Sequence, residues 1–172
     1  DHFGMEDYHV FSMESITSEA IDNGVALHVD DVAWAEKQMW APDAAHKNGR
    51  YYLYFPAKRP DGIFQIGVAV SDFPEGPFIP EKEAIKGSYS IDPAVYEDED
   101  GKNYIYFGGI WGGQLQKYRN NKYDSTNEEP LDKEPALGPI VAVLSDNMLE
   151  FAEEPKEIQI LDENGELLLA GD

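Results

Sequence analysis

The chain has 172 residues, 42% of them hydrophobic and 12% aromatic, so it can bury the core of one domain and does not have the composition of a disordered chain. Its 34 acidic residues against 13 lysines and arginines give a net charge of −21, which argues against nucleic acid and anionic membrane as partners. Neither an apolar run of about 18 residues nor a basic-then-apolar leader is present, and a chain without cysteine has no disulfide or thiolate metal site.

Taken in chain order, the sequence predicts short β-strands separated by turns. A β-branched strand that ends in serine and a polar turn is expected within residues 8–17, and similar strands within 67–78 and 141–151. Residues 15–21 and 32–38 have helical spacing but cover barely two turns each, so loops are expected there.

Two longer units, DAAHKNGRYYLYF (43–55) and DPAVYEDEDGKNYIYF (92–107), share a pattern of aspartate, small apolar stretch, glycine turn and aromatic strand. One offset of 52 residues relates their turn glycines and their strand tyrosines, Gly49 and Gly101, and Tyr54 and Tyr106. An offset of about 50 residues is typical of a propeller blade. The repeat therefore predicts an all-β propeller, with about three blades in this chain.

Turn dipeptides recur between the strands and accept the positive φ angles of tight turns. They are Asn23-Gly24, Asn48-Gly49, Asp61-Gly62, Glu75-Gly76, Asp100-Gly101 and Asn164-Gly165. In the first aromatic strand, Tyr52 and Tyr54 alternate with Leu53 and Phe55, which predicts a core strand sandwiched between two neighbours.

Among many carboxylates, Asp43 and Asp92 differ by context, because each opens a repeat unit and follows apolar or aromatic residues. The first strand of each propeller blade lines the central channel, so residues at such strand starts converge on one mouth. Pro93 is expected to hold Asp92 in extended geometry and so to direct its side chain. The alternative is that an aspartate before proline merely opens a turn. The acidic run at 97–100 is interpreted as a solvated turn, since it lacks the spacing of a calcium loop.

Four segments together, MWAPDAAHKNGRYYLYF, GVAVSDFPEGPF, SIDPAVYEDEDGKNYIYFGG and WGGQLQ, resemble glycoside hydrolase family 43 over nearly the whole chain. This family of five-bladed β-propellers includes β-xylosidases, α-L-arabinofuranosidases and arabinanases. The resemblance implies that residues 1–172 form a partial catalytic domain, from the end of blade one through blade three and a connecting stretch. It implies an inverting hydrolase acting on arabinose- or xylose-containing saccharides, with a carbohydrate as partner.

The resemblance also implies roles for single residues. Asp92, in Ile-Asp-Pro, matches the aspartate that tunes the pKa of the general acid and orients the sugar. Trp40 resembles the aromatic wall of the sugar subsite, and Ile91 occupies a position that also faces the sugar. Trp111 and Gln114 resemble subsite contacts. Asp43 is grouped with these substrate-binding candidates, although the aspartate that it matches would have a structural or supporting role.

Two departures from the family pattern suggest a fragment that is inactive alone. The general base lies in an upstream Asp-Pro and the general acid in a later blade, whereas the only Asp-Pro here contains Asp92. The missing blades would come from the rest of the chain or from another copy. No metal ligand set or cofactor is predicted within the chain, and a channel calcium in the intact fold is left open, as is the cellular location.

Two other readings remain open on the sequence. One is a non-catalytic carbohydrate-binding or scaffold propeller that keeps aromatic residues such as Trp40 and Trp111 for stacking. The other is a small β protein whose matching segments reflect only blade packing.

Overall fold

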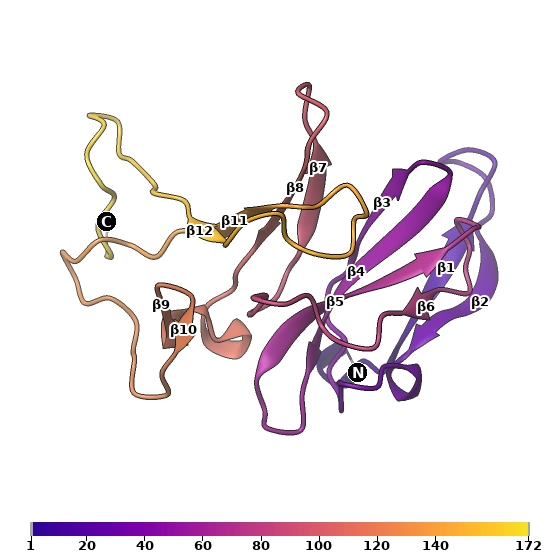
Figure 1. Cartoon of the computed structure of the whole chain (residues 1–172), viewed down its shortest axis with the longest axis horizontal. Helices are drawn as coiled ribbons and strands as arrows, with labels where there is room; N and C mark the ends of the chain where they lie inside the picture. The colour runs from indigo at the N-terminus through magenta and orange to yellow at the C-terminus, as the bar shows by residue number, and fades with distance from the viewer. Residues whose placement is uncertain (1, 172) are drawn as a thin grey trace.

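The computed structural model describes residues 2–171, which form antiparallel sheets joined by turns and short 3₁₀ helices (Figure 1). The first four-stranded sheet has the order β3-β4-β5-β6 and the second has the order β7-β8-β11-β12, while β1 pairs with β2 and β9 with β10. The strands are β1 (Asp7–Ser12), β2 (Ile21–His28), β3 (Asp43–Lys47), β4 (Arg50–Lys58), β5 (Phe64–Ser71), β6 (Ile79–Pro80), β7 (Ala94–Glu97), β8 (Asn103–Phe107), β9 (Tyr118–Arg119), β10 (Lys122–Tyr123), β11 (Ile140–Val143) and β12 (Lys156–Glu157). The 3₁₀ helices are η1 (His2–Gly4), η2 (Val29–Asp31), η3 (Trp111–Gly113) and η4 (Leu115–Lys117).

The all-β prediction is confirmed, and so are the two repeat units, each of which is a hairpin. Asn48 and Gly49 close the first hairpin at φ 54° and 77°, the left-handed pair that a two-residue turn requires. The second hairpin has a longer loop, residues 98–102. No helix of residues 2–171 is long and apolar enough to cross a membrane.

The strand pairing corrects the alignment of the two repeat aspartates. Asp43 pairs with Tyr54 as the first residue of β3, whereas the matching Tyr106 pairs with Ala94. Asp92 therefore lies two residues before β7 and is not the structural counterpart of Asp43.

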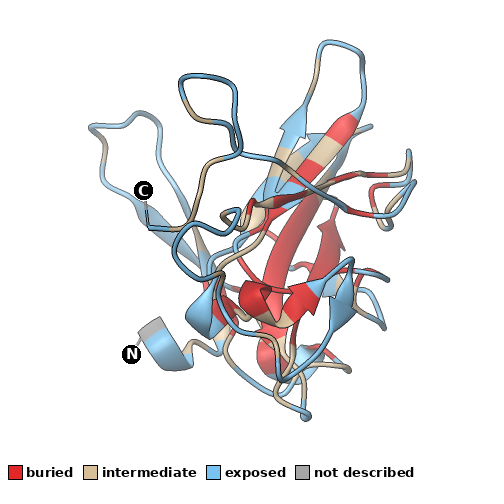
Figure 2. Ribbon diagram, turned by 90° about the vertical axis from the view of Figure 1, so that its left-hand side faces the viewer, coloured by how far each residue is buried: buried red, intermediate tan, exposed pale blue. Residues whose placement is uncertain are grey.

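The core has two parts, one on each face of the β3–β6 sheet. One part lies between this sheet and the β7–β12 sheet, and the other lies between it and β1–β2. Strand β4 contributes to both, because Tyr52 and Tyr54 face the β7–β12 sheet while Leu53 and Phe55 face β1–β2. Figure 2 shows buried residues concentrated in the central strands and exposed ones in the loops. The prediction of a sandwiched aromatic strand is confirmed.

The predicted loops at 15–21 and 32–38 are confirmed, except that Ile21 is already the first residue of β2. The predicted turn at Asn23-Gly24 is wrong. Both residues lie inside β2, where the pairing with β1 shifts register and Gly24 has φ 89°. A β-bulge needs the same positive φ as a turn, so the dipeptide alone does not separate the two.

Candidate active site

A cavity of about 370 Å³ lies where the N-terminal segment meets the segments that precede β3 and β7. It is lined by Phe3, Met5, Trp40, Ala41 and Asp92. The fold thus brings together two residues singled out in the sequence, Trp40 and Asp92, although 52 positions separate them.

Trp40 is fixed in place by contacts on several sides. Its indole N–H donates to the Phe3 carbonyl at 3.0 Å. Its ring packs against the rings of Phe3 and Phe64, with centroids 5.3 and 4.8 Å away. Its carbonyl accepts a hydrogen bond from the Tyr8 hydroxyl. The indole is therefore a pre-positioned apolar wall of the cavity.

Asp92 supplies the carboxylate of the cavity. Its φ of 57° is left-handed, so the expected extended geometry is wrong. Proline at 93 disfavours the right-handed helical region, and aspartate is one of the few residues that tolerate the left-handed alternative. Within residues 2–171 the carboxylate makes no hydrogen bond or ion pair.

Burial raises the pKa of Asp92 above its ordinary value. Asp92 as a whole is exposed to solvent. The rise in its pKa therefore comes from protein that is packed around only part of the carboxyl group. A carboxylate that is partly desolvated, unpaired and beside an indole ring is typical of a functional site, because structural carboxylates are usually paired.

Ile91 lies behind Asp92 and does not line the cavity. It is only 9% exposed, and a Cβ atom added at Gly109 or Gly113 would lie 2.7 or 2.6 Å from its Cγ1. That Ile91 faces the sugar stays a prediction. Its packing against Gly109 and Gly113 supports a role in holding the neighbouring Asp92 in place.

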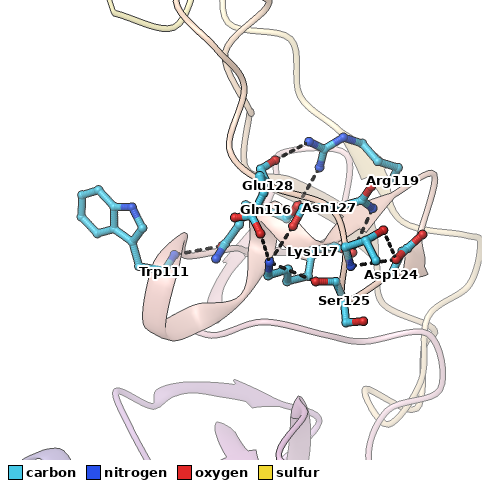
Figure 3. A network of polar contacts seen from close by, with 9 residues as sticks. Trp111, Gln116, Lys117, Arg119, Asp124, Ser125, Asn127 and Glu128 are labelled. Atoms are coloured by element: carbon cyan, nitrogen blue, oxygen red, sulfur yellow. Dashed lines mark hydrogen bonds and ion pairs between the residues drawn. The ribbon is translucent and has the colours of Figure 1, made fainter.

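Trp111 begins η3 and is 68% exposed, at φ 53°. Figure 3 shows its ring projecting away from the polar network that its backbone joins. Its backbone N–H donates to Gln116 Oε1 at 2.9 Å. Lys117 holds the following loop through Glu128 Oε1 at 2.9 Å and the Asn127 carbonyl at 2.6 Å. The loop therefore presents the indole to solvent from an ordered base, outside the cavity that Trp40 lines.

Gln114 uses its amide to join two loops. Its Oε1 accepts from the Phe64 N–H at 3.0 Å, and its Nε2 donates to the Gly62 carbonyl at 3.0 Å. Each end of the amide thus has one main-chain partner, which leaves one donor hydrogen and one acceptor position. Its predicted contact with substrate is untested.

Asp43 joins the first strands of the two sheets. Its Oδ2 accepts from the Val95 N–H at 2.6 Å, which links β3 to β7. The group is half-buried and does not line the cavity. This contact favours the structural role over the substrate contact, and the assignment stays a prediction.

Phe3 and Met5 were missed by sequence reasoning. They lie in an N-terminal segment without repeat or motif. Hydrogen bonds from the Trp40 indole N–H to the Phe3 carbonyl and from the Met39 N–H to the Met5 carbonyl bring that segment to the cavity. The apolar side chains of that segment were the only sequence feature that could have indicated a place in the cavity.

A channel calcium in the intact fold stays a prediction. Among residues 2–171, no three histidine, aspartate or glutamate side chains lie close enough together to hold a metal ion.

Comparisons with known proteins agree with the resemblance seen in the sequence. The sequence model described as "Glycosyl hydrolases family 43" matches residues 22–147. The whole chain is 59% identical to 55% of "Xylosidase/arabinosidase 43A" from Humicola insolens, and 57% identical to 53% of "Xylosidase/arabinosidase" from Bacteroides ovatus.

A solved structure is similar over the same span. The crystal structure of the GH43_1 enzyme from Xanthomonas citri complexed with xylotriose matches with a TM-score of 0.96 and 60% identity. The match covers 99% of this chain and 52% of that one. The chain thus spans about half the length of the relatives it matches.

Proposed function

Because this chain belongs to glycosyl hydrolase family 43, we propose that the intact protein hydrolyses xylose- or arabinose-containing saccharides with inversion of the anomeric carbon. The relatives' names, xylosidase and arabinosidase, support the substrate class. The similarity over the whole chain argues against a small β protein that matches only in its blade packing.

The observation that carries the proposal is the unpaired Asp92 carboxylate in one cavity with Trp40. An indole face offers a sugar ring an apolar platform, and a carboxylate beside it can accept hydrogen bonds from hydroxyl groups. The cavity therefore has the two kinds of surface that a pentose ring needs.

Asp92 would act on another acid and not on the scissile bond. In an inverting hydrolase, a base removes a proton from water as the water attacks the anomeric carbon, and an acid protonates the leaving oxygen. These two groups lie about 6.5–9.5 Å apart. A third carboxylate near the acid disfavours its ionisation and keeps it protonated near neutral pH. The base and acid are proposed to lie outside this chain, which alone would be inactive.

The architecture proposed for the intact protein is a five-bladed propeller, of which residues 1–172 are the end of blade one through blade three and a connecting stretch. A comparison of the repeat-equivalent residues Tyr54 and Tyr106 supports this proposal. Tyr54 is fully buried against the neighbouring sheet, whereas Tyr106 is 37% exposed and has no such neighbour covering it among the described residues. Tyr96 on β7 is exposed as well. Such an aromatic sheet face normally packs on a neighbour. The rest of the chain, or another copy, would cover it.

The test uses the full-length protein with nitrophenyl xyloside and nitrophenyl arabinofuranoside as substrates. Asp92→Asn should lower kcat/KM by about 10²-fold, the lower end of what acid–base catalysis contributes. Glu99→Gln, a neutralised carboxylate in the exposed 98–102 turn, is the matched control and should be fully active. NMR of the first product should show the inverted anomer.

Asp92→Asn should not lower stability. Since burial raises the pKa of Asp92, its stabilising contribution is present below the unfolded pKa of about 4 and is lost as the pH rises through the folded pKa. At neutral pH the negative charge of Asp92 therefore lowers the stability of the folded protein, and asparagine removes that charge. Asparagine also tolerates a positive φ. An active Asp92→Asn enzyme would refute the proposal. A wild-type protein that binds xylotriose without cleaving it would favour the carbohydrate-binding propeller instead.

A further inference from the structure

Residues 108–113, here called the glycine loop, are attached to the Asp92 segment by one buried hydroxyl. Ser90 is fully buried, and its Oγ accepts from the Gly109 N–H at 2.9 Å and donates to the Gly109 carbonyl at 3.1 Å. A single side chain thus satisfies both backbone polar groups of one loop residue.

The loop also lies in direct contact with the residue between Ser90 and Asp92. A Cβ atom at Gly109 would be 2.7 Å from Ile91 Cγ1, and Gly108 donates its N–H to the Ile91 carbonyl at 2.9 Å. The same Cβ position is 3.5 Å from Asp92 Oδ2. The loop can approach this closely only because glycine stands there.

The backbone that carries the carboxylate is held in an unusual conformation. Ser90 and Asp92 have φ angles of 64° and 57°, on either side of the buried Ile91. Residues other than glycine keep such angles only where the surrounding structure determines them. The bonds from Ser90 to the loop and the packing of Ile91 beneath it are that determining structure.

The far end of the loop touches the other wall of the cavity. A Cβ atom at Gly112 would lie 3.2 Å from Trp40 Cη2 and 3.3 Å from Cζ3. One loop therefore backs Asp92 through Gly109 and Trp40 through Gly112.

We infer that Ser90 is a positioning residue, whose hydroxyl holds the glycine loop as a shared backing for Asp92 and Trp40 and so sets the carboxylate against the indole across the cavity. This inference rests on the proposed function, because it gives Asp92 and Trp40 their roles. Ser90 itself would touch no substrate, since it is fully buried and does not line the cavity.

The chain contains a close control for this role. Ser88 is 4% exposed, and its Oγ accepts from the Ile66 N–H and donates to the Ile66 carbonyl, both at 3.1 Å. Ser88→Ala and Ser90→Ala thus remove the same reciprocal pair of hydrogen bonds, but Ser88 is bonded to β5 and not to the glycine loop.

In the full-length protein, both variants should unfold at lower denaturant concentration than the wild type. Only Ser90→Ala should lower kcat, by tenfold or more, because a displacement of about 1 Å at a catalytic group can cost about 10²-fold. Its KM should change much less than its kcat. A Ser90→Ala enzyme with the kcat of Ser88→Ala would overturn the inference.

A second variant keeps the test decisive where Ser90→Ala does not fold. Gly112 has no positive φ, so Gly112→Ala fits the backbone and should push the Trp40 ring by a few tenths of an ångström. It should raise KM several-fold with kcat little changed, and an unchanged KM would refute the shared backing. Loss of activity in Asp92→Asn with unchanged kinetics in Ser90→Ala and Gly112→Ala would reject this inference alone. An active Asp92→Asn enzyme would reject the proposed function.

Discussion

Replacing Asp43 with alanine separates a structural role from a substrate contact. The change removes the acceptor of the 2.6 Å hydrogen bond from the Val95 N–H and leaves that donor unpaired between β3 and β7. A hydrogen bond to a charged group contributes about 1.5–3 kcal/mol, and half-burial of the pair favours the lower end, about 1.5 kcal/mol. Asp43→Asn keeps an oxygen acceptor without the charge, so its loss should be smaller, about 0.5–1 kcal/mol.

The assay is denaturant unfolding of the full-length protein, with the midpoint compared at unchanged slope. Asp146→Ala is the control, because the Asp146 side chain is fully exposed and lies 3.9 Å from Lys47 Nζ, and such a pair contributes little. Kinetics of the same samples should give an unchanged KM for Asp43→Ala. A wild-type unfolding midpoint together with a raised KM would refute the structural role and restore Asp43 as a sugar contact.

Two further predictions concern stability. Tyr54→Phe leaves the buried Met148 carbonyl without the hydroxyl that donates to it at 2.8 Å, so unfolding should become easier by about 1–3 kcal/mol. Tyr52→Phe is the control, since the Tyr52 hydroxyl makes no hydrogen bond within residues 2–171, and an equal loss in both variants would contradict the reasoning. The hydrogen bond to Asp22 at 2.9 Å raises the pKa of His9, so the stability lost in His9→Gln should be largest below the unfolded pKa of about 6.5 and should fade as the pH rises through the folded pKa. An NMR titration of His9 with a midpoint at or below 6.5 would disprove the pairing.

The aromatic alternation in β4 was predictable because side chains of a strand point alternately to its two faces, whatever lies beyond. The hairpin at Asn48-Gly49 was predictable because its dipeptide accepts the left-handed angles that the turn requires. The same rule misplaced Asn23-Gly24, since a bulge uses the same angles. Local chemistry specifies a conformation and does not specify the element that contains it.

In the candidate site, too, some residues could be predicted from the sequence and some contacts could not. Asp92 and Trp40 could be chosen from the sequence because their neighbours form recognisable motifs. The hydrogen bonds of Asp43 and Gln114 could not be predicted from the sequence, because their partners are backbone groups about 50 residues away. A backbone N–H or carbonyl carries no sequence signature, so its pairing depends on register and loop path.

The sequence by itself determined the all-β class, the hairpin repeat and the motifs around Asp92 and Trp40, because strand alternation, turn angles and motif spacing are local properties. Only the tertiary structure placed Phe3 in the cavity and joined Ser90 to the glycine loop. Such contacts follow from how distant segments pack, where closeness in space is unrelated to distance along the chain.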